Sequence, residues 1–191
     1  TFNLENKKTT FVTRKSRYFA PALSPDGNLV AVVEVTPEDN QRLVIFRNPS
    51  GELHTMMSFP GNPMIQTPSW SADGNEVVAV LVDERGKHLV ITDLMRGEQN
   101  VIYSSGHTEI SYPVFYENYI LFSGAFNGID NIYALDRNSK TIRQITSVEY
   151  GATNPSISPN GAWMVFENYT STGYQAALIS LDENEWRPAE T

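Results

Sequence analysis

The chain has 191 residues, of which 40% are hydrophobic and 11% aromatic, which is enough apolar material to bury a core. With 14 basic and 22 acidic residues, its formal net charge of −8 argues against a nucleic-acid partner held through phosphates. The absence of cysteine excludes disulfides and thiolate metal sites, and no apolar run approaches the roughly 18 residues of a membrane helix, so we expect no membrane insertion by this segment.

One short phrase occurs four times along the chain, beginning at Pro21, Pro68, Pro113 and Pro155. It reads Pro-Ser-Trp-Ser-Ala-Asp-Gly at residues 68–74, and its proline recurs at intervals of 42 to 47 residues. One four-stranded propeller blade takes roughly 40 to 50 residues. We therefore expect an all-β fold, a β-propeller made of four consecutive four-stranded antiparallel blades. Their predicted bounds are about 16–60, 61–104, 105–147 and 148–191.

The first predicted element, Thr9-Thr-Phe-Val-Thr13 within residues 1–15, looks like a spare outer strand. It either completes the fourth blade, closing a four-bladed ring, or is the last strand of a preceding blade. We favour the second explanation and a larger propeller, because rings run from about four to eight blades and rings of four are uncommon.

Each phrase is followed by further predicted strands, rich in β-branched residues and flanked by turn residues. The expected second strands are 29–35, 76–82, 119–123 and 162–167, the third strands 43–46, 89–92, 132–135 and 177–181, and the outer strands 53–59, 99–103 and 142–146. The fourth unit has no convincing outer strand, because residues 185–189 contain a proline that cannot donate to a ladder. The Asp-Gly or Asn-Gly pairs indicate tight turns, and Trp70 and Phe115 are expected between blades.

These residues resemble the TolB-like (WD-repeat-like) propeller repeats of bacterial envelope proteins. Pro68 to Gly74 is similar to their Pro-x-Trp-Ser-Pro-Asp-Gly phrase, Gly128 to Asp136 to their Gly-x-x-x-Ile-Tyr-x-x-Asp stretch, and Arg143-Gln-Ile-Thr146 to their Arg-x-Leu-Thr ending. The resemblance implies the fold and an extracytoplasmic location, in the periplasm or cell envelope. It does not determine the function, since similar repeats occur in periplasmic scaffolds, in propellers that cap serine peptidases and in large envelope proteins.

The sequence contains none of the contiguous motifs of a catalytic site, a calcium loop or a phosphate loop. We therefore expect no catalytic residues, no enzyme activity, no metal site and no cofactor in this chain. His54 and His88 lie in predicted strands and are expected to face solvent. His107 lies in a polar loop near Glu109 and Tyr112.

In a propeller, the loops joining one blade to the next and the loops between second and third strands share one face. The candidate binding residues on that face are Tyr18, His107, Glu109, Tyr112, Asn127, Asp130, Tyr150 and Tyr169. Tyrosines in polar loops bury a large area at low entropic cost when they bind. The alternative is that these rings pack beneath the loops.

The expected function is that of a non-catalytic protein- or peptide-binding propeller module of a larger extracytoplasmic bacterial protein. One alternative is an accessory propeller that gates substrate access to a peptidase or other hydrolase. A carbohydrate-binding propeller is another.

Overall fold

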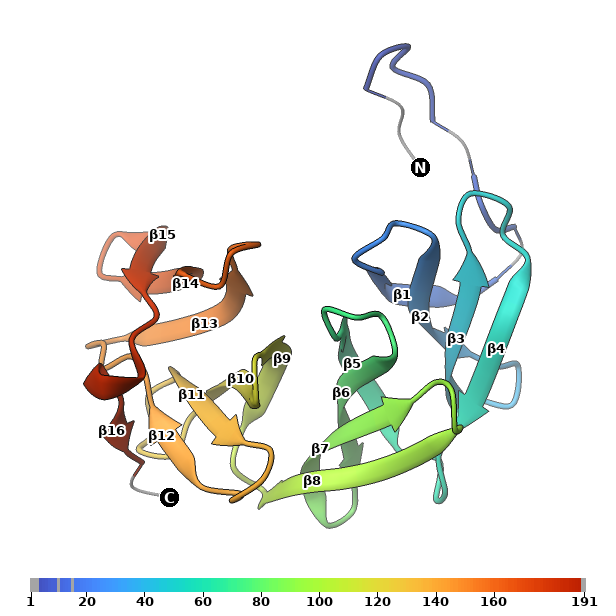
Figure 1. The fold of residues 1–191 in the computed structure, drawn as a ribbon. Helices are drawn as coiled ribbons and strands as arrows, with labels where there is room; N and C mark the ends of the chain where they lie inside the picture. Colours follow the sequence, from blue (N-terminus) through green and yellow to red (C-terminus); the bar gives the residue numbers. More distant parts are fainter. Residues whose placement is uncertain (1–3, 10, 15, 190–191) are drawn as a thin grey trace.

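The computed structural model describes residues 4–9, 11–14 and 16–189 as four antiparallel sheets that follow one another along the chain (Figure 1). Blade one comprises β1 (Tyr18–Leu23), β2 (Leu29–Val35), β3 (Gln41–Arg47) and β4 (Leu53–Ser58). Blade two comprises β5 (Met64–Trp70), β6 (Glu76–Asp83), β7 (Gly86–Asp93) and β8 (Glu98–Gly106).

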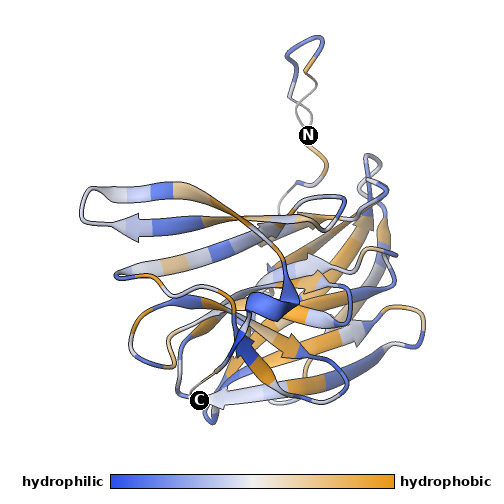
Figure 2. Cartoon of the chain, turned by 60° about the vertical axis from the view of Figure 1, so that its left-hand side comes forward, coloured by the Kyte–Doolittle hydropathy of each residue, from blue (hydrophilic) through white to orange (hydrophobic). Residues whose placement is uncertain are grey.

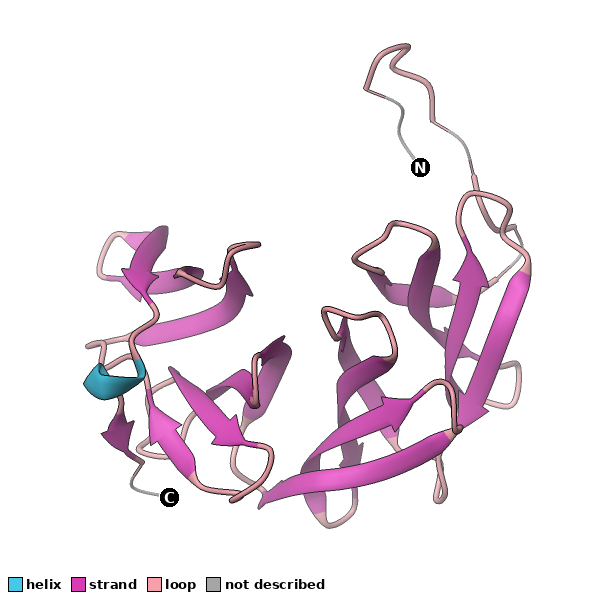
Figure 3. Cartoon of the chain, viewed as in Figure 1, coloured by secondary structure: helices cyan, strands magenta, loops and turns pink. Residues whose placement is uncertain are grey.

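Blade three comprises β9 (Ile110–Tyr116), β10 (Tyr119–Gly124), β11 (Asn131–Asp136) and β12 (Ile142–Gln144). Blade four comprises β13 (Gly151–Ile157), β14 (Trp163–Thr170) and β15 (Gly173–Ser180). Within the described residues the helical structure is a single 3-10 turn, Glu183–Glu185 (Figure 3).

The all-β fold of four consecutive antiparallel blades is confirmed, and the blades form an open arc instead of a closed ring (Figure 1). The inner strands pack side by side, β1 against β5, β5 against β9 and β9 against β13. Three buried clusters fill the three boundaries between neighbouring blades. Apolar residues accordingly run along the strands, while the connecting loops are mainly hydrophilic (Figure 2).

The second strands are buried on both faces, as their unbroken apolar sequences predict. In β6, Val77, Ala79 and Leu81 pack towards blade one, whereas Val78 and Val80 pack towards blade three. Trp70 is 8% exposed at the boundary between blades one and two. Phe115 is half-buried against the next cluster, beneath the guanidinium of Arg137.

The segment after β15 joins blade three and not blade four. Strand β16 (Arg187–Pro188) pairs with β12, so blade three has five strands and blade four has three. Trp186 explains this path, because its ring is buried between the two blades and contacts the rings of Tyr116 and Tyr119, at centroid distances of 6.1 and 5.0 Å.

The expected spare strand does not form in the part of the segment that the structure describes. Thr9 makes one isolated bridge, residues 11–13 are not in a strand, and residue 10 lies outside the described residues. Val12 instead packs against Val32, Val44 and Phe46 of blade one. The segment extends away from blade one, on the opposite side of the arc from blade four (Figure 1).

The repeated phrase forms the inner strand and the turn after it, and its serine shapes that turn. In blade two, Ser71 Oγ donates to Asp73 at 2.6 Å and accepts from the Glu76 N–H at 2.9 Å. Gly74 then has a φ of +72°, the left-handed value predicted for the turn. The same bonds recur at Ser24 and Ser158, while blade three lacks the phrase's serine and turns through Glu117.

Each inner strand also contains a bulge at its X-Pro step. The residue before each proline has positive φ, between +47° and +57°, and the strand register shifts there. Proline cannot donate to the ladder, so the bulge falls where a ladder bond is already missing. The four residues are Ala20, Thr67, Tyr112 and Asn154.

Candidate recognition surface

The blade-to-blade connections and the connections between second and third strands lie at one end of the sheets, here called the loop end. The pairing shows this, since the start of each inner strand faces the end of a second strand: Tyr18 pairs with Glu34, Met64 with Val82, Ile110 with Gly124, and Gly151 with Tyr169. The opposite end carries the Ser-x-Asp-Gly turns and is called the turn end. All eight candidate residues fall at the loop end.

A lysine joins blades two and three at the loop end. The ammonium of Lys87 forms an ion pair with Glu109 and donates to Gln66 Oε1 at 3.4 Å and to the Ile110 carbonyl at 3.3 Å. The Lys87 side chain is only 15% exposed. The preceding residue, Gly86, starts β7 tightly against the carbonyl of Gly106. Glu109 is therefore held in place by a largely buried cation.

Asp130 extends this polar group towards blade four. Burial raises the pKa of its carboxyl, the charge of Glu109 raises it further, and Lys87 opposes both effects. Its carbonyl accepts from the Ala152 N–H at 2.7 Å. A Cβ placed on Gly151 would lie 3.7 Å from the Cβ of Tyr169 and 3.9 Å from that of Asp130, so these two side chains flank Gly151.

The structure therefore brings several candidate residues into one strip across blades two to four. We call Lys87, Glu109, Asp130, Tyr169 and Tyr174 the loop-end strip. The rings of Tyr169 and Tyr174 contact each other at 4.9 Å and are 46% and 71% exposed. Tyr174, at the start of β15, was not a candidate; its place beside Tyr169 follows from the β14–β15 register.

Two further tyrosines are exposed at the loop end, Tyr112 at 39% and Tyr150 at 49%. Tyr112 lies in β9 at the bulge before Pro113, and Tyr150 in the connection to β13. The rings of Tyr112, Tyr150 and Tyr169 thus present a substantial part of their surface to solvent and are not packed beneath the loops.

The remaining candidates are placed differently. Tyr18 is half-buried and stacks on Phe46 at 6.0 Å, and burial raises the pKa of its hydroxyl, so it belongs to the packing of blade one. Asn127 is exposed, and its Oδ1 accepts from the Ile129 N–H within its own loop. His107 is exposed in the same loop as Glu109.

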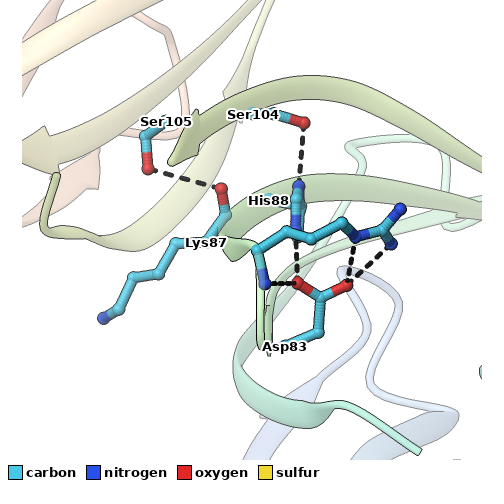
Figure 4. Close-up of polar contacts among 6 residues, drawn as sticks. Asp83, Lys87, His88, Ser104 and Ser105 are labelled. Carbon is cyan, nitrogen blue, oxygen red and sulfur yellow. Dashed lines mark hydrogen bonds and ion pairs between the residues drawn. The ribbon is translucent and has the colours of Figure 1, made fainter. Parts of the chain in front are cut away.

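Sequence reasoning missed a polar chain beside the strip, on blade two (Figure 4). His88 Nε2 lies 3.0 Å from Asp83 Oδ1, and His88 Nδ1 lies 2.8 Å from Ser104 Oγ. The Arg85 side chain and then His88 hold the pKa of the Asp83 carboxyl far below its usual range. Because an ionised carboxylate can only accept, His88 Nε2 is the donor in its hydrogen bond to Asp83.

The expectation that His88 faces solvent is wrong, since its side chain is 12% exposed, whereas His54 is exposed as expected. The connectivity Asp–His–Ser resembles that of a hydrolase. In a hydrolase of that type, the negative charge of the aspartate stabilises the imidazolium that forms during the reaction. Here the charge of Asp83 is already compensated by Arg85, whose Nη2 lies 2.7 Å from Asp83 Oδ2. We interpret this series of contacts from Asp83 through His88 to Ser104, here called the relay, as a structural link between strands β6, β7 and β8.

The relay lines a groove of about 600 Å³ between blades one and two. Its walls include Phe59, Leu81, Val90 and Val101. Among the described residues, no group of three side chains is arranged to hold a metal ion, and no helix is long and apolar enough to cross a membrane.

The chain is similar to known proteins in both sequence and fold. Residues 3–188 match the TolB beta propeller domain. The chain belongs to this family. The Bacillus subtilis protein described as uncharacterized peptidase YuxL is 26% identical over 153 residues, which are 80% of this chain and 22% of that protein.

Solved structures share the fold at low sequence identity. TolB from Acinetobacter baumannii gives a TM-score of 0.74 at 15% identity, covering 92% of this chain and 44% of the other. A putative TolB from Agrobacterium tumefaciens gives 0.75 at 18%, covering 88% and 63%. A puromycin-hydrolyzing peptidase of Mycobacterium tuberculosis gives 0.66 at 14%, covering 90% and 30%. The chain thus spans less than two thirds of each of these proteins.

Proposed function

We propose that this TolB-family propeller is a recognition module, without catalysis of its own, that binds a protein or peptide at its loop end as part of a larger extracytoplasmic bacterial protein. The family and its TolB structures support an extracytoplasmic location. The single observation that carries the proposal is the group of exposed tyrosines around the loop-end strip.

The chemistry of the strip suits a peptide partner. Exposed rings supply apolar area with few rotatable bonds, and aromatic residues carry a disproportionate share of interface energy. The Lys87–Glu109 ion pair adds fixed polar groups among these exposed rings. Glu109 is 53% exposed, so its carboxylate is accessible to a backbone N–H or a basic side chain. A cation that is itself largely buried keeps this carboxylate ordered before binding, which lowers the entropic cost of association.

A second candidate is an accessory propeller that gates access to a peptidase. The peptidase description of the B. subtilis relative favours it. This candidate places the nucleophile in another domain, so it requires no catalytic group within the blades. The carbohydrate-binding alternative draws its support from the same exposed rings, and among the solved structures of similar fold is an oligogalacturonate lyase in complex with manganese, at 17% identity.

The experiment is a selection from a random-peptide library on the immobilised chain, followed by affinity measurement. Replacing Tyr112, Tyr150 and Tyr169 together with Ala should abolish capture of the selected peptides. Trp163→Ala is the matched control, because Trp163 is also an exposed aromatic residue, at 47%, but lies at the turn end. Circular dichroism and thermal melting establish that both variants fold.

Two results would contradict the proposal. One is a folded triple variant that binds the selected peptides as tightly as the wild type. The other is a Trp163→Ala variant that loses binding while the triple variant keeps it. Glycan-array binding that depends on the same tyrosines, without any peptide binding, would favour the carbohydrate alternative. A parallel assay of the propeller joined to its natural flanking sequence, against peptide substrates of increasing size, tests the gating candidate.

A further inference from the structure

The groove between blades one and two has an apolar interior. Phe59 and Leu81 are each 7% exposed and Val90 is 2% exposed, while Val101 on β8 is 62% exposed at the mouth. Pro60 and Pro63, in the connection between the two blades, also line it. Its volume of about 600 Å³ lies within the range of pockets that hold small ligands or side chains.

Two polar side chains of the groove, Ser104 and Gln99, offer acceptors. Ser104 Oγ lies 2.8 Å from His88 Nδ1 and is exposed, and a hydroxyl oxygen has two lone pairs, so at least one is available to a ligand. The side-chain amide of Gln99 donates to the Ser58 carbonyl at 3.2 Å, and among the described residues nothing donates to its Oε1. Asp83 is compensated by Arg85, so no uncompensated charge faces the interior. An apolar interior with two open acceptors complements a flat apolar group that ends in one donor.

The molecule already uses such a group at its blade boundaries. Trp70 lies in the same boundary and donates its indole N–H to the Ala22 carbonyl. Trp186 fills the boundary between blades three and four, and it comes from an extended segment that pairs through Arg187 and Pro188 with the outer strand β12. The outer strand of blade two, β8, lines the groove, and among the described residues no strand pairs with its outer edge.

We propose that this groove binds a tryptophan or tyrosine side chain of an extended peptide segment that runs along the outer edge of β8. The ring lies against Phe59, Leu81 and Val90, and the indole N–H or phenol O–H donates to Ser104 or Gln99. The Trp186 segment on blade three is an intramolecular counterpart of the buried ring and the paired segment, although the indole Nε1 of Trp186 is buried without a hydrogen-bond partner. The inference rests on the proposed peptide-binding function and names the residue type that the peptide carries.

The test is a titration of the chain with N-acetyltryptophanamide, N-acetyltyrosinamide and N-acetylleucinamide, followed by the methyl NMR signals of Leu81, Val90 and Val101. The two aromatic amides should shift these signals saturably, and the leucine amide should bind at least about fivefold more weakly because it has no donor at its tip. Ser104→Ala should weaken the aromatic amides by about the same factor.

The two control variants distinguish a loss of binding caused by a blocked groove from a loss caused by damage to the fold. Val101→Asp places a charge at the groove mouth and should abolish the shifts. Met95→Asp makes the same kind of change at the turn end, where Met95 is 82% exposed, and should leave them unchanged. The absence of saturable shifts with any amide, equal binding of the leucine amide, or unchanged binding by Val101→Asp would each overturn the inference.

This test can fail independently of the proposed function. The triple tyrosine variant leaves the groove intact and should bind the aromatic amides like the wild type. If the amides do not bind while selected peptides still require the three tyrosines, the groove inference fails and the recognition surface stands. If the amides bind while the triple variant captures the selected peptides normally, the loop-end surface fails and the groove stands.

Discussion

The indole Nε1 of Trp70 lies 2.9 Å from the carbonyl oxygen of Ala22, so the inner strands of blades one and two are joined by a side-chain hydrogen bond. Trp70→Phe removes this donor and reduces packed volume. We expect a loss of about 1 to 3 kcal/mol in the free energy of unfolding, measured by urea titration. Trp163→Phe, at an exposed site, should change it by less than about 0.5 kcal/mol, and equal effects of the two substitutions would contradict this account.

The serine of the repeated phrase should contribute to stability. Ser71 is 6% exposed, and Ser71→Ala removes both the bond to Asp73 and the acceptor for the Glu76 N–H. We expect a loss of about 1 to 2 kcal/mol in urea titration. Ser180→Ala, on the exposed edge of blade four, is the control and should be nearly neutral. A stable Ser71→Ala variant would mean that Asp73 and the backbone maintain the turn alone.

Two glycines with positive φ should respond differently to alanine. At Gly74, a Cβ meets nothing within 4 Å, so Gly74→Ala should cost only the left-handed strain of about 1 kcal/mol. At Gly86, a Cβ would lie 1.9 Å from the Gly106 carbonyl oxygen, so Gly86→Ala must also move β8. Gly86→Ala should therefore lower the melting temperature much further and disturb the Lys87–Glu109 pair. Equal melting temperatures would argue against the close approach of β7 and β8.

Alkaline pH should destabilise the boundary between blades three and four. Tyr119 donates its hydroxyl to Glu183 at 2.7 Å, and this bond, followed by burial, raises the pKa of Tyr119 to about 12. An unfolded tyrosine ionises near pH 10, so the stabilisation is complete below about pH 10 and is lost as the pH rises towards 12. Urea titrations across this window should show a steeper loss for the wild type than for Tyr119→Phe, and identical slopes would exclude this coupling.

Much of the fold follows from local sequence. The recurring proline predicts the blades, and β-branched runs such as Val77 to Val82 predict the central strands, because a strand buried on both faces needs no alternation of polarity. The loop end is also predictable, since antiparallel strands of known order fix which connections share an end. The sequence leaves open whether the rings of Tyr112, Tyr150 and Tyr169 are exposed or packed beneath the loops. The three-dimensional packing leaves all three exposed.

Other features depend on contacts that single segments do not specify. The relay through His88 requires a bulge in β8, which sets His88 opposite Ser104, and local sequence does not position such a bulge. The Lys87–Glu109 pair joins residues of different blades, which come together only when the blades pack. The two-residue strand β16 is too short to show periodicity, and its partner was determined by where Trp186 is buried. The described part of the segment expected as a strand at residues 9–13 makes only an isolated bridge at Thr9, and Val12 packs on blade one instead.

Hydrogen–deuterium exchange of the chain with and without a library-selected peptide tests the central claim most directly, because it locates the bound surface without any substitution. The recognition surface predicts slower exchange within residues 107–112, 127–130, 150–154 and 169–174 at the loop end. The turns at residues 24–28, 71–75 and 158–162 should exchange at the same rate with and without the peptide. Protection of those turns, with no change at the loop end, would contradict the account.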